Sequence, residues 1–174
     1  IKIKFVILHD IYYTVFFVKR MPFYHQLIAT GCGVGFFPYG PGTMGALFAI
    51  VVWYLLSLLV SMPSLIGITL ALVVLFTFLG AWSATVSERY WGEDPSRVVI
   101  DEVVGQWIVL LAIPFDFQFW HVIVALALFR FFDIVKPLGV RKMENFKGGW
   151  GIMADDILAG VYGFIVLQLL LIVL

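Results

Sequence analysis

The chain has 174 residues, of which 63% are hydrophobic and only 13% are charged. Soluble domains carry roughly a quarter charged residues, so this composition argues against a soluble monomer and against intrinsic disorder. Eleven basic and eleven acidic residues cancel to a formal charge of zero, which gives no support for a nucleic-acid partner. The one cysteine, Cys32, excludes an internal disulfide and a cysteine-based metal cluster, and we expect it to be a small buried thiol.

Residues 1–20 are treated as an N-terminal extension without an assigned role, and residues 21–174 as a single membrane domain. Within the extension, Phe5–Val18 is apolar but short, and His9 and Asp10 interrupt it. One interpretation of this segment is an extra interfacial helix.

The charge distribution indicates membrane-spanning segments, because no charged residue occurs between Arg20 and Glu88. Within this gap, Met44–Ser61 and Leu65–Ser87 are each long enough to cross about 30 Å of hydrocarbon at about 1.5 Å per residue. The intervening Ser61-Met62-Pro63-Ser64 stretch predicts a turn. The uncharged run Ile157–Leu174 predicts a third spanning helix.

Two further apolar stretches, Val103–Ile113 and Phe119–Phe132, are short for spanning helices and are separated by Pro114-Phe115-Asp116. They predict a helical hairpin that enters the bilayer without necessarily crossing it. The expected fold is therefore an all-α, polytopic integral membrane protein: a bundle of three spanning helices with a shorter helical hairpin.

This topology places Lys19–Gly42, Glu88–Glu102 and Arg130–Asp155 on one side of the membrane. Nine of the eleven basic residues share that side: Lys19, Arg20, Arg89, Arg97, Arg130, Lys136, Arg141, Lys142 and Lys147. The positive-inside rule assigns such a side to the cytoplasm. We therefore expect the active-site loops to lie on the cytoplasmic face.

The same topology brings five carboxylates to one level, namely Asp101, Glu102, Asp133, Asp155 and Asp156. Grouped carboxylates repel one another unless a positive charge lies between them, and oxygen-only ligands favour Mg²⁺. The alternative is that the first and last pairs open helices as capping or dipole-stabilising residues. Capping explains Asp133 poorly, because an acid at a helix C-terminus opposes the helix dipole.

Basic residues accompany these acids. Arg130 lies one helical turn before Asp133, and Lys136 follows in the next loop, so both are candidate phosphate-binding residues. A structural ion pair is the alternative for Arg130, and a lipid-binding surface is the alternative for Lys142 and Lys147.

Two glycine-rich segments, Gly31–Gly45 and Gly148–Gly151, each precede a predicted spanning helix. The backbone N–H groups at such helix starts could bind an oxyanion, with Thr43 as a candidate phosphate ligand. Tight turns, with Thr43 as an N-cap, are the structural alternative. Gly160 and Gly163 are expected to allow close helix packing.

Four ordered motifs resemble those of the phosphatidylglycerophosphatase A family. They are His25-Gln26-Leu27-Ile28-Ala29-Thr30-Gly31 running to Pro41-Gly42-Thr43, Asp101-Glu102-Val103-Val104-Gly105-Gln106, Phe129-Arg130-Phe131-Phe132-Asp133-Ile134-Val135-Lys136-Pro137, and Lys147-Gly148-Gly149 with Asp155-Asp156. The likeness covers about residues 24–163. It implies an all-helical, Mg²⁺-dependent phosphatase of the bacterial cytoplasmic (inner) membrane that converts phosphatidylglycerophosphate to phosphatidylglycerol and phosphate.

The resulting hypothesis is that some of the five carboxylates hold Mg²⁺, that Arg130 and Lys136 bind the phosphate, and that a metal-activated water attacks phosphorus. A covalent aspartyl-phosphate is an alternative. Two rival functions are a CDP-alcohol phosphotransferase-like membrane enzyme and a non-enzymatic ion-binding membrane protein. The expected partners are the lipid substrate and membrane lipids.

Overall fold

The structure is a computed structural model that describes residues 20–173, and all regular secondary structure within them is helical. The predicted all-α class is therefore confirmed. The expected interfacial helix of the N-terminal extension lies outside the described residues. The helices are α2 (Phe23–Ala29), the 3₁₀ helix η1 (Val34–Phe36), α3 (Pro41–Ser57), α4 (Met62–Trp91), α5 (Ile100–Leu110), α6 (Phe119–Val135), α7 (Val140–Met143) and α8 (Gly149–Val173).

Two of these helices, α4 with 30 residues and α8 with 25, are long and apolar enough to cross a membrane. The remaining predicted span, Met44–Ser61, corresponds to α3, which ends at Ser57 rather than Ser61 and has 17 residues. Helix α3 is therefore apolar but shorter than the two helices that are long enough to cross a membrane. At about 1.5 Å per residue, α4 is about 45 Å long, so it exceeds a hydrocarbon layer of about 30 Å. Its C-terminal end can thus place Glu88 outside the apolar layer.

Helix α5 lies in the centre of the bundle, with α3, α4, α6 and α8 around it. Every residue from Val103 to Leu110 is buried. Glycines allow this packing: a Cβ on Gly160 of α8 would lie 2.6 Å from the carbonyl oxygen of Gly105 on α5. On the other side, the Trp107 indole donates a hydrogen bond to the Ala49 carbonyl of α3 at 3.0 Å. The predicted helix-packing role of Gly160 is confirmed.

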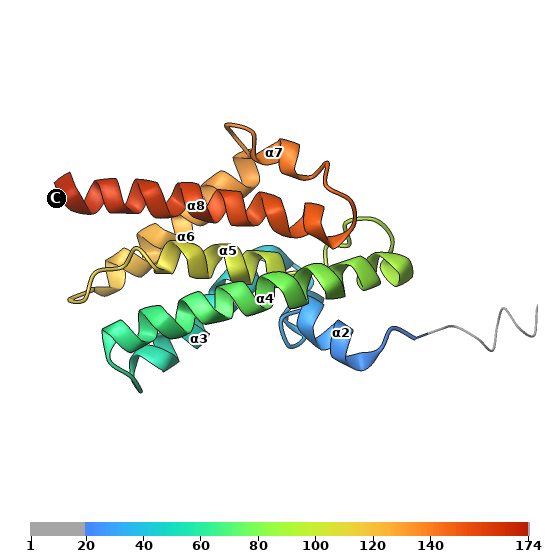
Figure 1. The fold of residues 1–174 in the computed structure, drawn as a ribbon, viewed down its shortest axis with the longest axis horizontal. Helices are drawn as coiled ribbons and strands as arrows, with labels where there is room; N and C mark the ends of the chain where they lie inside the picture. The colour runs from blue at the N-terminus through green and yellow to red at the C-terminus, as the bar shows by residue number, and fades with distance from the viewer. Residues whose placement is uncertain (1–19, 174) are drawn as a thin grey trace, which may run out of the picture.

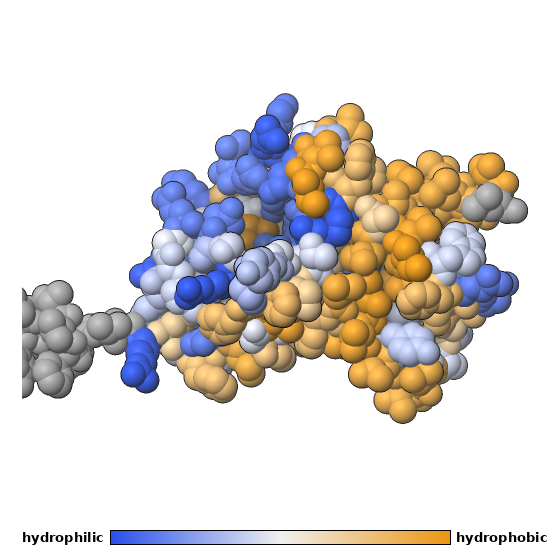
Figure 2. Space-filling model, turned by 180° about the vertical axis from the view of Figure 1, so that it is seen from behind, coloured by the Kyte–Doolittle hydropathy of each residue, from blue (hydrophilic) through white to orange (hydrophobic). Residues whose placement is uncertain are grey.

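The loops separate to the two ends of the bundle (Figure 1). One end holds α2, the α4–α5 loop, α7 and the start of α8, whereas the α3–α4 and α5–α6 turns and the C-terminus lie at the other. The view from behind shows hydrophilic surface gathered at one end and apolar surface over much of the rest (Figure 2). This arrangement agrees with the expected grouping of charged segments.

One expectation about the α2–η1 connection is wrong. Cys32 is exposed rather than buried. Its backbone has a φ of +59°, in a tight turn whose N–H bonds back to the Leu27 carbonyl at 2.8 Å. The side chain therefore turns outward, away from the core.

Candidate active site

A cavity of about 780 Å³ opens at the charged end of the bundle. It is lined by the start of α3, the α4–α5 loop, the start of α5, the end of α6 and the segment from α7 into α8. All seven charged residues singled out from the sequence line this cavity: Asp101, Glu102, Arg130, Asp133, Lys136, Asp155 and Asp156. The structure therefore brings together groups that are up to 55 positions apart in the sequence.

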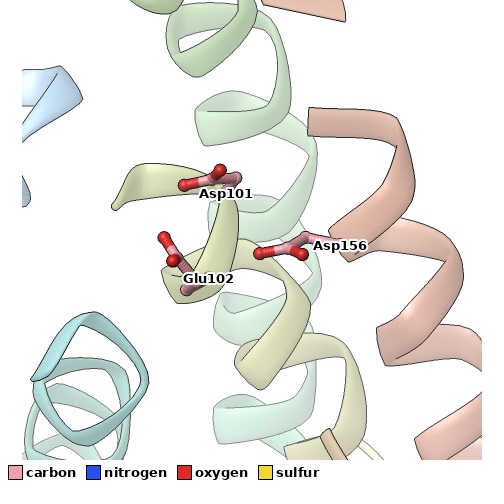
Figure 3. Close-up of side chains that lie close together, drawn as sticks. All are labelled: Asp101, Glu102 and Asp156. Carbon is pink, nitrogen blue, oxygen red and sulfur yellow. The ribbon is translucent and has the colours of Figure 1, made fainter. Parts of the chain in front are cut away.

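Three of the carboxylates form the centre of the site. Asp101 and Glu102 come from the first turn of α5, and Asp156 comes from α8. One oxygen from each lies within 4.8 Å of the other two, and the close-up shows the three side chains around a common space (Figure 3). We call these three residues the acidic centre. Their spacing would allow one cation to contact all three.

Helix capping does not account for this arrangement. Helix α8 begins at Gly149, so Asp155 and Asp156 lie about two turns inside it rather than opening it as the sequence suggested. Asp101 and Glu102 do open α5, but the N-cap is Val99 and no side chain caps that end. The two acids on α8 therefore gain nothing from a free helix N-terminus.

The acidic centre is poorly compensated by the protein itself. Buried oxygens of all three side chains have no hydrogen-bond partner among the described residues: Asp101 Oδ1, Glu102 Oε2 and Asp156 Oδ2. Burial raises the pKa of Asp101 and of Glu102, and the neighbouring negative charges raise that of Asp101 further. Buried carboxylates without partners are costly unless they are neutralised, and a cation would supply the missing charge.

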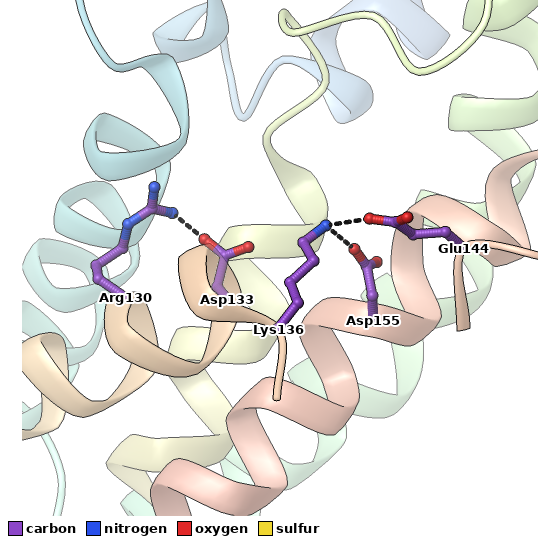
Figure 4. A network of polar contacts seen from close by, with 5 residues as sticks. All are labelled: Arg130, Asp133, Lys136, Glu144 and Asp155. Carbon is purple, nitrogen blue, oxygen red and sulfur yellow. Dashed lines mark hydrogen bonds and ion pairs between the residues drawn. The ribbon is translucent and has the colours of Figure 1, made fainter. Parts of the chain in front are cut away.

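Two cations line the same cavity as the acidic centre, and Figure 4 shows them with their acidic partners. Arg130 Nη1 lies 2.6 Å from Asp133 Oδ2, which is the pairing expected from their spacing on α6. Lys136 Nζ lies 2.5 Å from Asp155 Oδ2 and 2.7 Å from Glu144 Oε1. Both side chains line the cavity and are partly exposed, and each carries more N–H groups than these ion pairs use, so each could bind a further anion.

Lys136 adopts an unusual backbone to reach this position. It is the C-cap of α6, with φ 48° and ψ 52° in the left-handed region, a conformation that costs about 1–2 kcal/mol for a residue with a Cβ. Burial lowers the pKa of this lysine, but hydrogen bonds to Asp155 and Glu144 outweigh that effect and raise it above its ordinary value. The ammonium is therefore charged at any physiological pH.

The first turn of α3 forms the opposite wall, where Gly40, Pro41 and Gly42 line the cavity. Gly42 is in direct contact with the site, because a Cβ there would lie 2.0 Å from Glu102 Oε1 and 3.2 Å from Arg130 Nη1. The predicted phosphate ligand Thr43 lies in this turn but is not among the cavity-lining residues. The alternative of Thr43 as an N-cap is wrong, since Gly40 occupies that position.

The sequence reasoning missed four acidic residues of the cavity. Glu144 pairs with Lys136, and Glu88, Glu93 and Asp94 line the side formed by the α4–α5 loop. With them, nine acidic residues and only three basic ones line the cavity, the third basic residue being Lys147. One signal for these four residues was present in the sequence: all of them belong to segments that the predicted topology places at the charged end of the bundle.

These features define a class of protein: an apolar helical bundle with a charged cavity at one end, where carboxylates that could hold a cation lie beside a guanidinium and an ammonium that could bind a phosphate ester. Comparison with known proteins is more specific. The sequence profile described as "Phosphatidylglycerophosphatase A" matches residues 27–171. The chain belongs to the phosphatidylglycerophosphatase A family, and is accordingly a phosphoric monoester hydrolase.

Three relatives show how far the similarity extends. A Bacteroides thetaiotaomicron protein named "Putative phosphatidylinositol-3-phosphatase" is 61% identical over 86% of this chain and 95% of its own. Proteins named "Phosphatidylglycerophosphatase A" from Escherichia coli and Haemophilus influenzae are each 39% identical, over 78% and 81% of this chain and 77% and 85% of their own. No solved structure matches the chain.

Proposed function

We propose that this protein is a Mg²⁺-dependent lipid phosphatase that hydrolyses phosphatidylglycerophosphate to phosphatidylglycerol and phosphate in phospholipid biosynthesis. The observation that carries the proposal is the acidic centre, with ligand atoms within 4.8 Å of one another, beside Arg130 and Lys136 in one cavity. The two apolar helices α4 and α8 support a membrane location, in which a lipid headgroup would meet such a cavity.

The donor set fits a hard divalent cation. Asp101, Glu102 and Asp156 offer carboxylate oxygens, which Mg²⁺ prefers, and several of these oxygens lack a partner. Nine acidic against three basic side chains would repel a phosphate, so the cavity requires added positive charge before it binds one. Bound Mg²⁺ would supply Lewis-acid chemistry and charge neutralisation at the phosphoryl group.

The remaining charged residues have separable tasks in this proposal. Arg130 and Lys136 hold phosphoryl oxygens through their free N–H groups, and Thr43 remains a candidate from the first turn of α3. Asp133 and Asp155 orient the two cations and stand close enough to the acidic centre to join the metal site or take part in catalysis. The general base or nucleophile is one of the five carboxylates.

We further propose a multi-pass arrangement in a bacterial cytoplasmic membrane, with α3 as a third span and the cavity facing the cytoplasm. Support comes from the helix directions, which return the α4–α5 loop and the segment from the end of α6 to the start of α8 to the same end. The basic residues Arg89, Arg97, Arg141, Lys142 and Lys147 all belong to that end, as the positive-inside rule requires of a cytoplasmic side.

The relatives favour two lipid substrates. The two 39% identical relatives are named for phosphatidylglycerophosphate, whereas the 61% identical relative is named for a phosphorylated inositol lipid. The second candidate substrate is therefore phosphatidylinositol 3-phosphate. Both carry a phosphomonoester on a polyol-derived lipid headgroup, so the same cavity chemistry would serve either. Family membership favours hydrolysis over the transferase and ion-binding alternatives.

Phosphate release from detergent-purified protein tests this proposal. The substrates are phosphatidylglycerophosphate, phosphatidylinositol 3-phosphate, phosphatidate and glycerol 3-phosphate, each with Mg²⁺ or with EDTA. We expect lipid hydrolysis with Mg²⁺, its loss in EDTA and its loss in Asp156→Asn. The matched control is Asp116→Asn, an exposed acid in the turn at the opposite end of the bundle, which should keep native activity. Full activity in EDTA with no metal detectable by elemental analysis would contradict the proposal.

A further inference from the structure

Gln106 on α5 is a fully buried polar side chain that the proposed function does not use. Its exposed fraction is 0%, and neither its Nε2 nor its Oε1 has a hydrogen-bond partner among the described residues. A buried amide without hydrogen-bond partners lowers the stability of the fold, so its presence calls for a structural or functional explanation. Gln106 does not line the cavity, which excludes direct contact with a substrate there.

The position of Gln106 on its helix directs it toward the acidic centre. It follows Glu102 by four residues, so the two lie on one face of α5. Helical side chains lean toward the helix N-terminus, which places the amide over the turn that holds Glu102. Arg130 lies against the same carboxylate, since both its Nη1 and Glu102 Oε1 contact the position of a Cβ on Gly42.

The unpartnered atoms of Glu102, Gln106 and Arg130 are complementary as hydrogen-bond donors and acceptors. Glu102 Oε2 is a buried acceptor without a donor, and Arg130 Nε is a buried donor without an acceptor. Gln106 offers both missing groups, an N–H₂ donor and a carbonyl acceptor, from one side chain. A rotamer that brought the Gln106 amide between Glu102 and Arg130 would satisfy all three side chains.

We propose that Gln106 is a positioning residue that orients Glu102, the proposed metal ligand, and Arg130, the proposed phosphate-binding residue. Its Nε2 would donate to Glu102 Oε2, which would leave the other carboxylate oxygen for a cation, and its Oε1 would accept from Arg130 Nε. This inference rests on the proposed function of Glu102 as a metal ligand. Partners that orient metal ligands typically change metal affinity or activity by about 10–100-fold when they are removed.

The test measures metal binding directly. Metal-stripped protein in detergent is titrated with Mn²⁺, with free Mn²⁺ followed by electron paramagnetic resonance, and thermal unfolding is recorded on the same samples. Gln106→Met keeps the shape of the side chain and removes both polar groups, whereas Gln106→Asn keeps the amide but withdraws it by one methylene. The matched control is Gln168→Met, because Gln168 donates to the Ala112 carbonyl at 3.2 Å near the opposite end of α5.

We expect both Gln106 variants to bind Mn²⁺ about 10–100-fold more weakly than the native protein, with kcat lowered at subsaturating metal and no fall in melting temperature. Gln168→Met should bind Mn²⁺ as the native protein does. Native Mn²⁺ affinity in Gln106→Asn, or in a folded Gln106→Met, would overturn the inference. Native protein that binds Mn²⁺ but hydrolyses no lipid phosphate would instead refute the proposed function, and the binding data would still decide the role of Gln106.

Discussion

Replacing Gly42 with alanine should disable the site without unfolding the protein. The added Cβ would lie 2.0 Å from Glu102 Oε1, whereas real Cβ contacts are essentially never shorter than 3.0 Å. The carboxylate must therefore move by about 1 Å, and a misplacement of that size in a catalytic group can cost about 100-fold in rate. Because the contact is the far end of a flexible side chain, Glu102 can yield at little cost. Alanine also favours a helix over glycine by about 0.5–1 kcal/mol, so stability should not fall.

The assay is Mg²⁺-dependent phosphate release together with thermal unfolding in the same detergent. Gly67→Ala is the matched control, since Gly67 lies in α4 and a Cβ there would meet nothing within 4 Å. We expect Gly67→Ala to keep native turnover and Gly42→Ala to lose about 100-fold. Turnover of Gly42→Ala within twofold of native would show that the Glu102 carboxylate is not needed where the structure places it. A lower melting temperature with unchanged turnover would mean that the contact affects folding only.

Three further predictions concern the charged residues. Lys136→Met leaves the buried Asp155 unpaired and should lower the free energy of unfolding by about 2–4 kcal/mol, which thermal unfolding measures. Adding Asp155→Asn should restore most of that stability, whereas phosphate release should remain low. Asp133→Asn should reduce turnover by at least about 100-fold if the acid serves catalysis. A loss of about 1–3 kcal/mol in stability with near-native turnover would instead limit Asp133 to its ion pair with Arg130. A cysteine at Lys142, with Cys32 replaced, should resist an impermeant thiol reagent in intact cells, and ready labelling would reverse the proposed orientation.

The order and type of the helices could be predicted from the sequence because the signals were long and local. The uncharged gap before Glu88 and the run from Ile157 to Val173 predict helices by composition alone, and both are present in α4 and α8. The boundaries were less accurate. Helix α8 begins at Gly149, eight residues before its uncharged run, because the Gly149 and Gly151 backbones pack closely against α4 and the preceding loop and need no apolar side chains.

The convergence of the charged residues could also be predicted, since it follows from helix direction. The pairings within the cavity could not. Arg130 and Asp133 share a helix, so their ion pair follows from spacing, but the pairing of Lys136 with Asp155 depends on a left-handed residue at the end of α6. Local sequence gives little warning of such a backbone in a lysine. Likewise, the exposure of Cys32 depends on a turn that its neighbours Gly31 and Gly33 make possible.

The shortness of α5 explains why the site lies where it does. Eleven residues span only about 16 Å, so a central helix of this length begins inside the bundle rather than at its outer surface. Its first-turn acids, Asp101 and Glu102, are consequently surrounded by α3, α6 and α8, and Gly42 allows α3 to approach them closely. Water can no longer compensate these charges fully, which is the condition under which a cation and a phosphate interact most strongly with a protein. The glycines that bring the helices together are therefore as much a part of the site as its carboxylates.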